Sequence, residues 1–87
     1  MLVKKDPLNL TGKVAVITGG SSGIGLGVCE LLSAYGAKIA MVDISPKGEE
    51  KAQELRDAGR DAAFFQCDVT NEEQVKATVD AIVAKFG

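Results

Sequence analysis

Apolar residues along the chain occur either in short continuous runs or at intervals of three and four residues. The continuous runs span residues 14–18, 37–43 and 62–69. Runs of this length predict β-strands, and the first is apolar enough to predict a strand covered on both faces of a sheet. The segments that follow each run have the spacing of amphipathic helices. The sequence therefore predicts the order β-α-β-α-β-α.

The first and third predicted helices each carry an apolar stripe that we expect to face the core. The first stripe comprises Ile24, Val28, Leu31, Leu32 and Tyr35, and the second comprises Val75, Val79, Ile82, Val83 and Phe86. Glycine tolerates the positive φ at which many helices end. Gly36 and Gly59 are therefore expected to end the first two helices.

Two N-terminal capping signals set the predicted starts of the later helices. Ser45 is followed by Pro46, the pattern of an N-cap with proline in the first helical position. Thr70 is followed three residues later by Glu73, the spacing of a capping box. We therefore expect the second helix to follow Ser45 and run to about residue 58, and the third to follow Thr70.

Strands that alternate with helices form parallel sheets, because each helix returns the chain to the start of the next strand. Right-handed crossovers would give the strand order 3-2-1, which is half of a doubly wound sheet. Residues 1–12 are expected to be a lead-in containing the structure breakers Pro7 and Gly12, and residues 13–87 to form the domain. The predicted fold class is α/β.

Composition excludes several classes of partner. The net charge is −2, with 46% apolar and 25% charged residues, as in ordinary soluble proteins. The sequence has no basic face of the kind that indicates nucleic-acid binding. No segment approaches the roughly 18 apolar residues of a membrane span. The first ten residues lack the apolar core of a signal peptide. We therefore expect a cytoplasmic protein without nucleic-acid or membrane partners.

The two cysteines, Cys29 and Cys67, are far apart, and the chain has no histidine. This set does not form a zinc site. Free cysteine usually behaves as a small buried hydrophobic residue, so both are expected in the core. We expect no metal site, and catalysis by histidine is excluded within these residues.

The most informative segment is T-G-G-S-S-G-I-G, Thr18 to Gly25, between the first strand and the first helix. The first N–H groups of a helix have no partner within it, and its dipole places partial positive charge there. A phosphate satisfies both demands if the backbone comes close, and glycine removes the Cβ that would prevent this approach. On this reasoning a valine at Gly25 would block the anion. The alternative is that the glycines only form a tight turn.

The segment is neither a Walker A motif nor G-x-G-x-x-G. With the preceding L-T-G-K-V-A-V-I-T-G-G, it resembles the dinucleotide-binding fingerprint of the short-chain dehydrogenase/reductase family. The resemblance implies a Rossmann-type fold, three-layered α/β/α in the longer protein, with the NAD-binding half in residues 13–87. It assigns cofactor binding to Gly19, Ser21, Ser22, Gly23, Ile24 and Gly25. Ser21 and Ser22 are then hydroxyl donors to the pyrophosphate, or alternatively ordinary polar residues of a loop.

Two later segments extend the resemblance. Asp43 ends the second strand, where the family binds the adenosine ribose hydroxyls of NAD, and Ile44 after it is not the basic residue often found in NADP-dependent members. Asp68 and Val69 resemble the pair that contacts adenine, the carboxylate binding the amino group and the valine main chain the ring. As alternatives, Asp43 is a solvated carboxylate at a turn and Asp68 caps the following helix.

The resemblance implies an NAD-dependent oxidoreductase that transfers hydride between NAD(H) and a secondary alcohol or ketone, and a homo-oligomer. The family's catalytic Asn, Ser and Tyr-x-x-x-Lys do not occur here, since the one tyrosine, Tyr35, precedes Lys38 by three residues and not four. We expect Tyr35 in the core, no catalytic residue in this chain, and an inactive chain that ends before the catalytic half. One alternative is a stand-alone nucleotide-binding module that oligomerises through its open sheet edge. Another is an epimerase or regulator, whose usual T-G-x-x-G-x-x-G fits less well.

Overall fold

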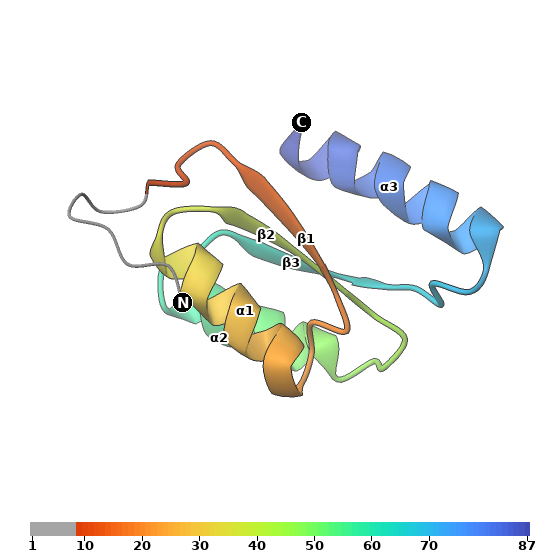
Figure 1. Cartoon of the computed structure of the whole chain (residues 1–87), viewed down its shortest axis with the longest axis horizontal. Coiled ribbons are helices and arrows are strands. Elements are labelled where there is room, and N and C mark those ends of the chain that lie inside the picture. The colour runs from red at the N-terminus through yellow and green to blue at the C-terminus, as the bar shows by residue number, and fades with distance from the viewer. Residues whose placement is uncertain (1–8) are drawn as a thin grey trace.

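The computed structural model describes residues 9–87 and contains six elements that alternate along the chain. They are β1 (Val14–Thr18), α1 (Gly23–Ala34), β2 (Lys38–Asp43), α2 (Gly48–Asp57), β3 (Ala62–Gln66) and α3 (Glu72–Phe86). The predicted order β-α-β-α-β-α is confirmed (Figure 1). Residues 1–8, including the predicted breaker Pro7, lie outside the described residues. No helix within residues 9–87 has the length and apolar character needed to cross a membrane.

The three strands are parallel and lie in the order β1-β2-β3, which is compatible with the predicted 3-2-1. Thr18 at the end of β1 pairs with Val42, and Asp43 at the end of β2 pairs with Gln66 at the end of β3. Parallel strands end at the same edge of a sheet. The segments that follow all three strands therefore lie next to one another.

Helices cover both faces of the sheet, with α1 and α2 on one side and α3 on the other (Figure 1). The alternation of side chains along β2 shows why both faces need cover. Ile39 and Met41 join the core on the α1 and α2 side, whereas Ala40 and Val42 join the core beneath α3. The predicted α/β class is confirmed, and the described residues already contain the three layers expected of the longer protein.

The core beneath α1 and α2 is the larger of the two. Its buried members are Cys29, Ala37, Ile39, Met41, Ala52, Leu55 and Ala62. The absence of a side chain at Gly48 lets α2 lie close to β3, because a Cβ there would overlap the ring of Phe64. Cys29 and Cys67 are both free and buried, as predicted, and residues 9–87 contain no group of acidic and cysteine side chains suited to hold a metal ion.

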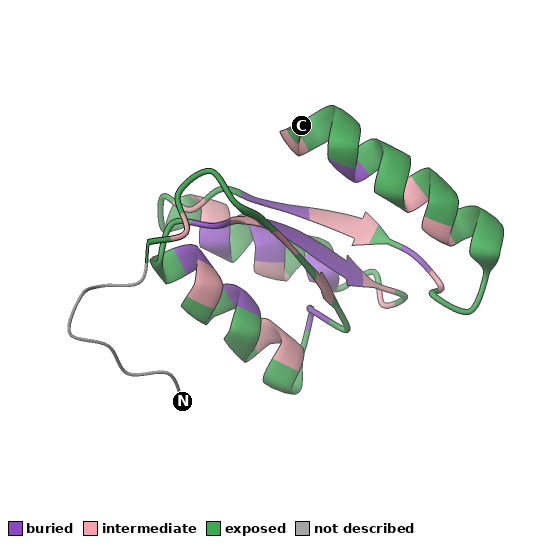
Figure 2. Cartoon of the chain, turned by 45° about the horizontal axis from the view of Figure 1, so that its top comes forward, coloured by how far each residue is buried: buried purple, intermediate pink, exposed green. Residues whose placement is uncertain are grey.

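The core beneath α3 leaves part of the sheet uncovered (Figure 2). Ile82 packs there, but Val79 and Val83 are exposed, and so are Val14 and Val16 on β1. The prediction that β1 is covered on both faces is therefore wrong for the described residues. The core beneath α3 is built on β2 and the end of β3, so only the face of β1 toward α1 is packed.

The buried face of α1 differs from the predicted stripe. Cys29 and Ser33 are buried, whereas Ile24, Val28, Leu31 and Tyr35 of the predicted stripe are exposed. Close packing explains the choice: the Cys29 thiol lies 3.8 Å from the carbonyl oxygen of Gly20. The stripe with the smaller side chains faces the sheet because it lets the helix approach the loop.

The first two helices end as predicted, with φ of +97° at Gly36 and +85° at Gly59. The prediction that Tyr35 lies in the core is wrong, since it is the C-cap of α1 and is 38% exposed. Its carbonyl oxygen accepts a hydrogen bond of 2.9 Å from the Leu10 N–H, which attaches the lead-in to the end of α1.

Both predicted N-caps are wrong, by two residues at α2 and by one at α3. The second helix begins at Gly48, and Ser45 instead shapes the turn before it, where its hydroxyl accepts from the Lys47 N–H at 3.3 Å. The cap of α3 is Asn71, whose side chain accepts from the Gln74 N–H at 3.1 Å. At α3 the residue after the predicted cap performs the same chemistry, because Asn and Thr can both cap a helix. At α2 the N-cap is Lys47, which makes no side-chain capping bond.

Candidate functional site

The loop between β1 and α1 leaves a group of main-chain N–H donors without partners. Gly19 and Gly23 have φ of +66° and +57°, which turn the chain sharply into the helix. The first helical hydrogen bond runs from the Leu26 N–H to the Ser22 carbonyl at 3.3 Å. Ser22, the N-cap, makes no side-chain capping bond. The N–H groups of residues 23–25 therefore have no acceptor among the described residues.

This helix start differs from the other two. The first turn of α1 contains no acidic residue, whereas α2 has Glu49 and Glu50 there and α3 has Glu72 and Glu73. Acidic side chains and caps offset the partial positive charge of a helix N-terminus. Among the helices of residues 9–87, α1 alone has neither an acidic residue in its first turn nor a side chain of its own that offsets this charge.

The loop glycines have different physical roles. A Cβ on Gly23 would meet nothing within 4 Å, so the space beside it is open to a ligand. A Cβ on Gly25 would instead overlap the carbonyl oxygen of Gly19, and one on Gly20 would lie 2.6 Å from the side chain of Met41. Glycine was expected at position 25 because a side chain there would block the anion, but the contact that a Cβ would make is with the Gly19 main chain. Glycine is needed at 25 so that the helix can pack against its own loop.

Asp43 at the end of β2 is held by three hydrogen bonds. The Ser21 hydroxyl and the Ser21 N–H both donate to Oδ2, the latter at 3.3 Å, and the Ser45 N–H donates to Oδ1 at 3.2 Å. These bonds, with the Ser21 hydroxyl the largest contributor, lower the pKa of the Asp43 carboxyl below its ordinary value of 3.8. The side chain is therefore an anion at neutral pH and acts as a hydrogen-bond acceptor.

Two clefts meet at Asp43. The larger, of about 540 Å³, is lined by Ser21, Ser22, Asp43, Ser45, Lys47, Glu50 and Lys51. The smaller, of about 200 Å³, is lined by Gly19, Val42, Asp43, Ile44, Cys67, Asp68 and Val69. Seven of the ten predicted site residues line one or both clefts, and the other three, Gly23, Ile24 and Gly25, form the first turn of α1 next to them.

Asp68 combines a structural bond with free acceptor capacity. Its Oδ1 accepts from the Thr70 hydroxyl at 2.7 Å and the Thr70 N–H at 2.9 Å, and these bonds lower the pKa of the carboxyl. Its Oδ2 accepts no bond from the described residues. Val69 beside it is 55% exposed. The alternative that Asp68 caps α3 is wrong, because Asn71 is the N-cap. One oxygen of Asp68 closes the turn before α3, and the other remains able to accept from a donor.

The sequence did not single out Ser45, Lys47, Glu50 and Lys51 as part of this site. Asp43 and Ser45 have the spacing at which an aspartate accepts from the main chain two residues on, so that contact had a signal. No sequence signal indicated that Lys47 and Lys51 line the larger cleft, because their position depends on α2 starting at Gly48 and not after Ser45. Lys51 is also paired with Glu54 at 3.5 Å.

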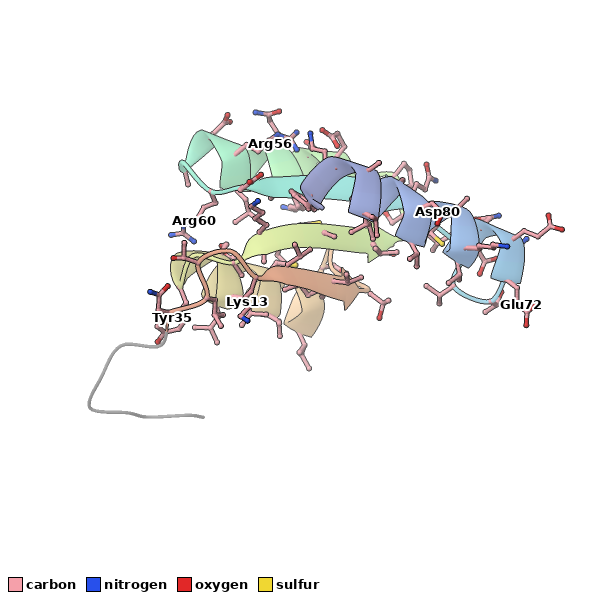
Figure 3. All side chains as sticks on the ribbon, turned by 90° about the horizontal axis from the view of Figure 1, so that it is seen from above. Lys13, Tyr35, Arg56, Arg60, Glu72 and Asp80 are labelled. Atoms are coloured by element: carbon pink, nitrogen blue, oxygen red, sulfur yellow. The ribbon has the colours of Figure 1, made fainter. Side chains whose placement is uncertain are left out.

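Tyr35 lies away from these clefts. Figure 3 shows it at the opposite end of the molecule from Glu72, which begins α3 just after Asp68 and Val69. In a parallel α/β unit the end of a helix lies at the edge where strands begin, and α1 ends at Tyr35. Neither cleft is lined by a tyrosine, and Cys67, which lines the smaller cleft, is buried.

Comparison with known proteins gives a consistent result. Residues 13–87 match the family model described as short chain dehydrogenase. The chain is 48% identical over 79 residues to (+)-borneol dehydrogenase 1 of Salvia officinalis, covering 90% of this chain and 29% of that protein. It is 46% identical over 86 residues to momilactone A synthase of Oryza sativa subsp. japonica, covering 98% and 31%. The chain thus spans less than a third of the length of these relatives.

Solved structures with the same fold include dehydrogenases as well. A short chain dehydrogenase/reductase from Burkholderia phymatum in complex with NAD superimposes with a TM-score of 0.86 and 36% identity, covering 91% of this chain and 28% of that one. A citronellol catabolism dehydrogenase from Pseudomonas aeruginosa PAO1 gives 0.87 and 34%, covering 94% and 35%. The glycine loop and the two aspartates at neighbouring strand ends are thus set in a fold that this family shares. The chain belongs to the short-chain dehydrogenase/reductase family.

Proposed function

We propose that these residues form the NAD-binding part of an oxidoreductase that transfers hydride between NAD and a secondary alcohol or ketone. One observation carries the proposal: the unpartnered N-terminus of α1 and the carboxylate of Asp43 lie at adjacent strand ends of the same sheet edge. The first suits a diphosphate and the second suits a ribose. When bound, the nicotinamide supplies or accepts the hydride.

The pyrophosphate is assigned to the first turn of α1. The N–H groups of residues 23–25 are free to donate, and no acidic side chain of that turn repels an anion. Gly23 leaves the space beside the main chain open. Anion binding at a helix N-terminus follows from these unsatisfied donors and the helix dipole together.

The adenosine is assigned to the two clefts that share Asp43. Its carboxylate keeps part of its acceptor capacity beyond the bonds from Ser21 and Ser45, and a ribose hydroxyl is a suitable donor. The smaller cleft, with Ile44, Asp68 and Val69, would hold the adenine, whose amino group can donate to the free oxygen of Asp68.

Preference for NAD over NADP follows from the charge of Asp43. Two negative charges about 4 Å apart repel by roughly 1–4 kcal/mol, which corresponds to about 5- to 1000-fold in affinity. Lys47 lines the same cleft and favours an added phosphate, whereas Glu50 opposes it. The carboxylate at the ribose position therefore decides the preference.

The acid–base step is assigned to residues outside this chain. Asp43 and Asp68 both have a lowered pKa and are ionised at neutral pH, so neither is a useful proton donor. Tyr35 is at the wrong end of α1. These residues would bind and orient the cofactor, and the substrate and the assembly into homo-oligomers would depend on the rest of the protein.

The test is calorimetric titration of the protein, as its gene encodes it, with NAD and with NADP. The expected result is NAD binding at least about 5-fold tighter than NADP. Oxidation of secondary alcohols with NAD, followed by NADH absorbance, tests the reaction class. A protein that binds neither cofactor would contradict the proposal.

A second candidate is a stand-alone nucleotide-binding module without catalysis. The exposed edge strand β1, with Val14 37% and Val16 55% exposed, favours it, because such an edge can pair with another copy. It predicts that the 87-residue chain alone forms a folded oligomer that binds NAD. An unfolded or aggregated chain in sedimentation experiments would exclude it.

A further inference from the structure

The hydroxyl of Ser21 is committed to Asp43. Ser21 is only 5% exposed, and its hydroxyl donates to Oδ2 of Asp43, across 22 positions of sequence. A serine hydroxyl has one proton to donate. While it bonds Asp43 it cannot also donate to a phosphate, so the pyrophosphate role that the family resemblance gave Ser21 does not describe this arrangement.

The bond also links the two halves of the cofactor site. Ser21 belongs to the loop before α1, and Asp43 ends the neighbouring strand β2. The Gly20 N–H donates to the Val42 carbonyl at 3.3 Å alongside it, so main chain and side chain join the loop to the strand end. The position of the ribose-binding carboxylate thus depends on the loop that would hold the pyrophosphate.

The two oxygens of Asp43 are not held equally. Oδ2 receives the Ser21 hydroxyl and a longer bond from the Ser21 N–H at 3.3 Å, whereas Oδ1 receives only the Ser45 N–H at 3.2 Å. Without the hydroxyl, two long main-chain bonds would remain. The hydroxyl bond is the shortest of the three, so the hydroxyl is the main constraint on the carboxylate plane.

We propose that Ser21 is a positioning residue that orients the Asp43 carboxylate toward the adenosine ribose and thereby sets the preference for NAD over NADP. The inference rests on the proposed function. A fixed carboxylate can accept from the ribose hydroxyls of NAD and stands directly opposite the extra phosphate of NADP. A carboxylate free to rotate loses part of both effects, so the affinity for NAD falls more than the affinity for NADP.

The experiment measures the ratio of the two dissociation constants, NADP over NAD, in the protein as its gene encodes it. Ser21→Ala should lower this ratio by roughly 10-fold, the range of one hydrogen bond to a charged group. Ser21→Thr keeps a hydroxyl and should retain most of the ratio. Ser33→Ala is the matched control: Ser33 is also 5% exposed, but its hydroxyl donates to the Glu30 carbonyl at 3.0 Å, within α1. It should leave the ratio unchanged.

A double-mutant cycle separates positioning from other roles. If Ser21 acts through Asp43, then Ser21→Ala should leave the ratio unchanged in an Asp43→Ala background, because the partner is already gone. An equal loss of affinity for both cofactors, or a further fall of the ratio in that background, would overturn the inference. The first result would indicate a pyrophosphate contact or a general loosening of the loop.

The remaining outcomes are also decisive. If Ser21→Ala does not fold, Ser21→Cys keeps the volume and weakens the donor, and an unchanged ratio in that variant would refute positioning. If the parent protein binds NAD tightly and Ser21→Ala retains the full ratio of dissociation constants, the inference about Ser21 is refuted but the proposed function is not. A parent that binds neither cofactor refutes the proposed function, and the inference fails with it.

Discussion

Gly25 in the first turn of α1 lies directly against the main chain of Gly19 at the end of β1. A Cβ on Gly25 would overlap the Gly19 carbonyl and lie 3.1 Å from the Gly20 Cα, all within the loop itself. Gly25→Ala should therefore push the helix away from its loop. We expect a loss of roughly 1–3 kcal/mol in the free energy of unfolding, and at least a 10-fold loss of NAD affinity, measured by urea unfolding and calorimetry.

Gly27, two residues further along the same helix, is the matched control for this change. A Cβ there meets nothing within 4 Å. Alanine in a helix interior is favoured over glycine by roughly 0.5–1 kcal/mol, so Gly27→Ala should stabilise the protein slightly and leave NAD affinity intact. Equal effects of the two substitutions would show that the contact with Gly19 has no consequence.

Asp43→Asn tests the charge at the ribose position. The substitution keeps the shape and removes the negative charge, so the preference for NAD should fall by about 5- to 1000-fold, with NADP binding more tightly than to the parent. Lys47 in the same cleft would then act on the added phosphate without the opposing carboxylate. Asp80→Asn, an exposed position on α3, is the control. A preference that survives in Asp43→Asn would show that Asp43 does not face the ribose.

The hydrogen bonds to Asp43 also predict how stability responds to acid. They hold its pKa in the folded protein below 3.8, whereas the unfolded chain titrates near 3.9. A lowered folded pKa contributes stability that is present above the unfolded value and is lost as the pH falls through the folded one. The free energy of unfolding should therefore drop below about pH 4.

Comparison of the parent with Asp43→Asn isolates this contribution. The variant should show a shallower loss of stability between roughly pH 4 and pH 2, because it has no carboxylate to protonate at this position. Asp80→Asn removes a carboxylate from an exposed position on α3 and is the control for the loss of charge. Identical acid profiles for the parent and Asp43→Asn would contradict the linkage.

Element order and the location of the two clefts could be predicted because both follow from strong local signals. Glycines and strand ends mark the positions of the loop, Asp43 and Asp68 in the sequence itself. The buried face of α1 could not be predicted, because the helix carries two apolar stripes and hydrophobicity alone favours the larger side chains. Packing against the Gly20 carbonyl selects the stripe that contains Cys29.

The bond between Ser21 and Asp43 has no sequence signal at all. The two residues are 22 positions apart, and nothing in their spacing distinguishes a serine that bonds an aspartate from one that faces solvent or phosphate. The parallel pairing of β1 and β2 brings them together. The helix caps failed for a simpler reason, because Thr70 and Asn71 are adjacent and both able to cap.

Cys29 offers a chemical probe of folding. It is fully buried, and burial raises the pKa of its thiol to about 11. The thiolate is the reactive form, so neither exposure nor ionisation favours reaction at pH 8. Cys67 is 2% exposed. We expect a colorimetric disulfide reagent to label both thiols only as the protein unfolds in urea, and rapid labelling of Cys29 in the native protein would contradict this burial.

Val16 can show whether a longer form of the protein covers the α3-side face of β1. It is 55% exposed on the α3 side of an edge strand, whereas Ile17, its neighbour in sequence, packs against the core beneath α1 and α2. In the 87-residue chain, Val16→Thr should change the free energy of unfolding by no more than about 0.5 kcal/mol. If further residues of the protein cover this face, the added hydroxyl is buried and the same change should cost roughly 1–3 kcal/mol. Ile17→Thr should lower the free energy of unfolding in both the short and the long chain, so it is the control for the effect of threonine at a packed position of β1. Urea unfolding of the two lengths of chain measures the difference, and a large cost of Val16→Thr in the short chain would contradict the exposure of this face.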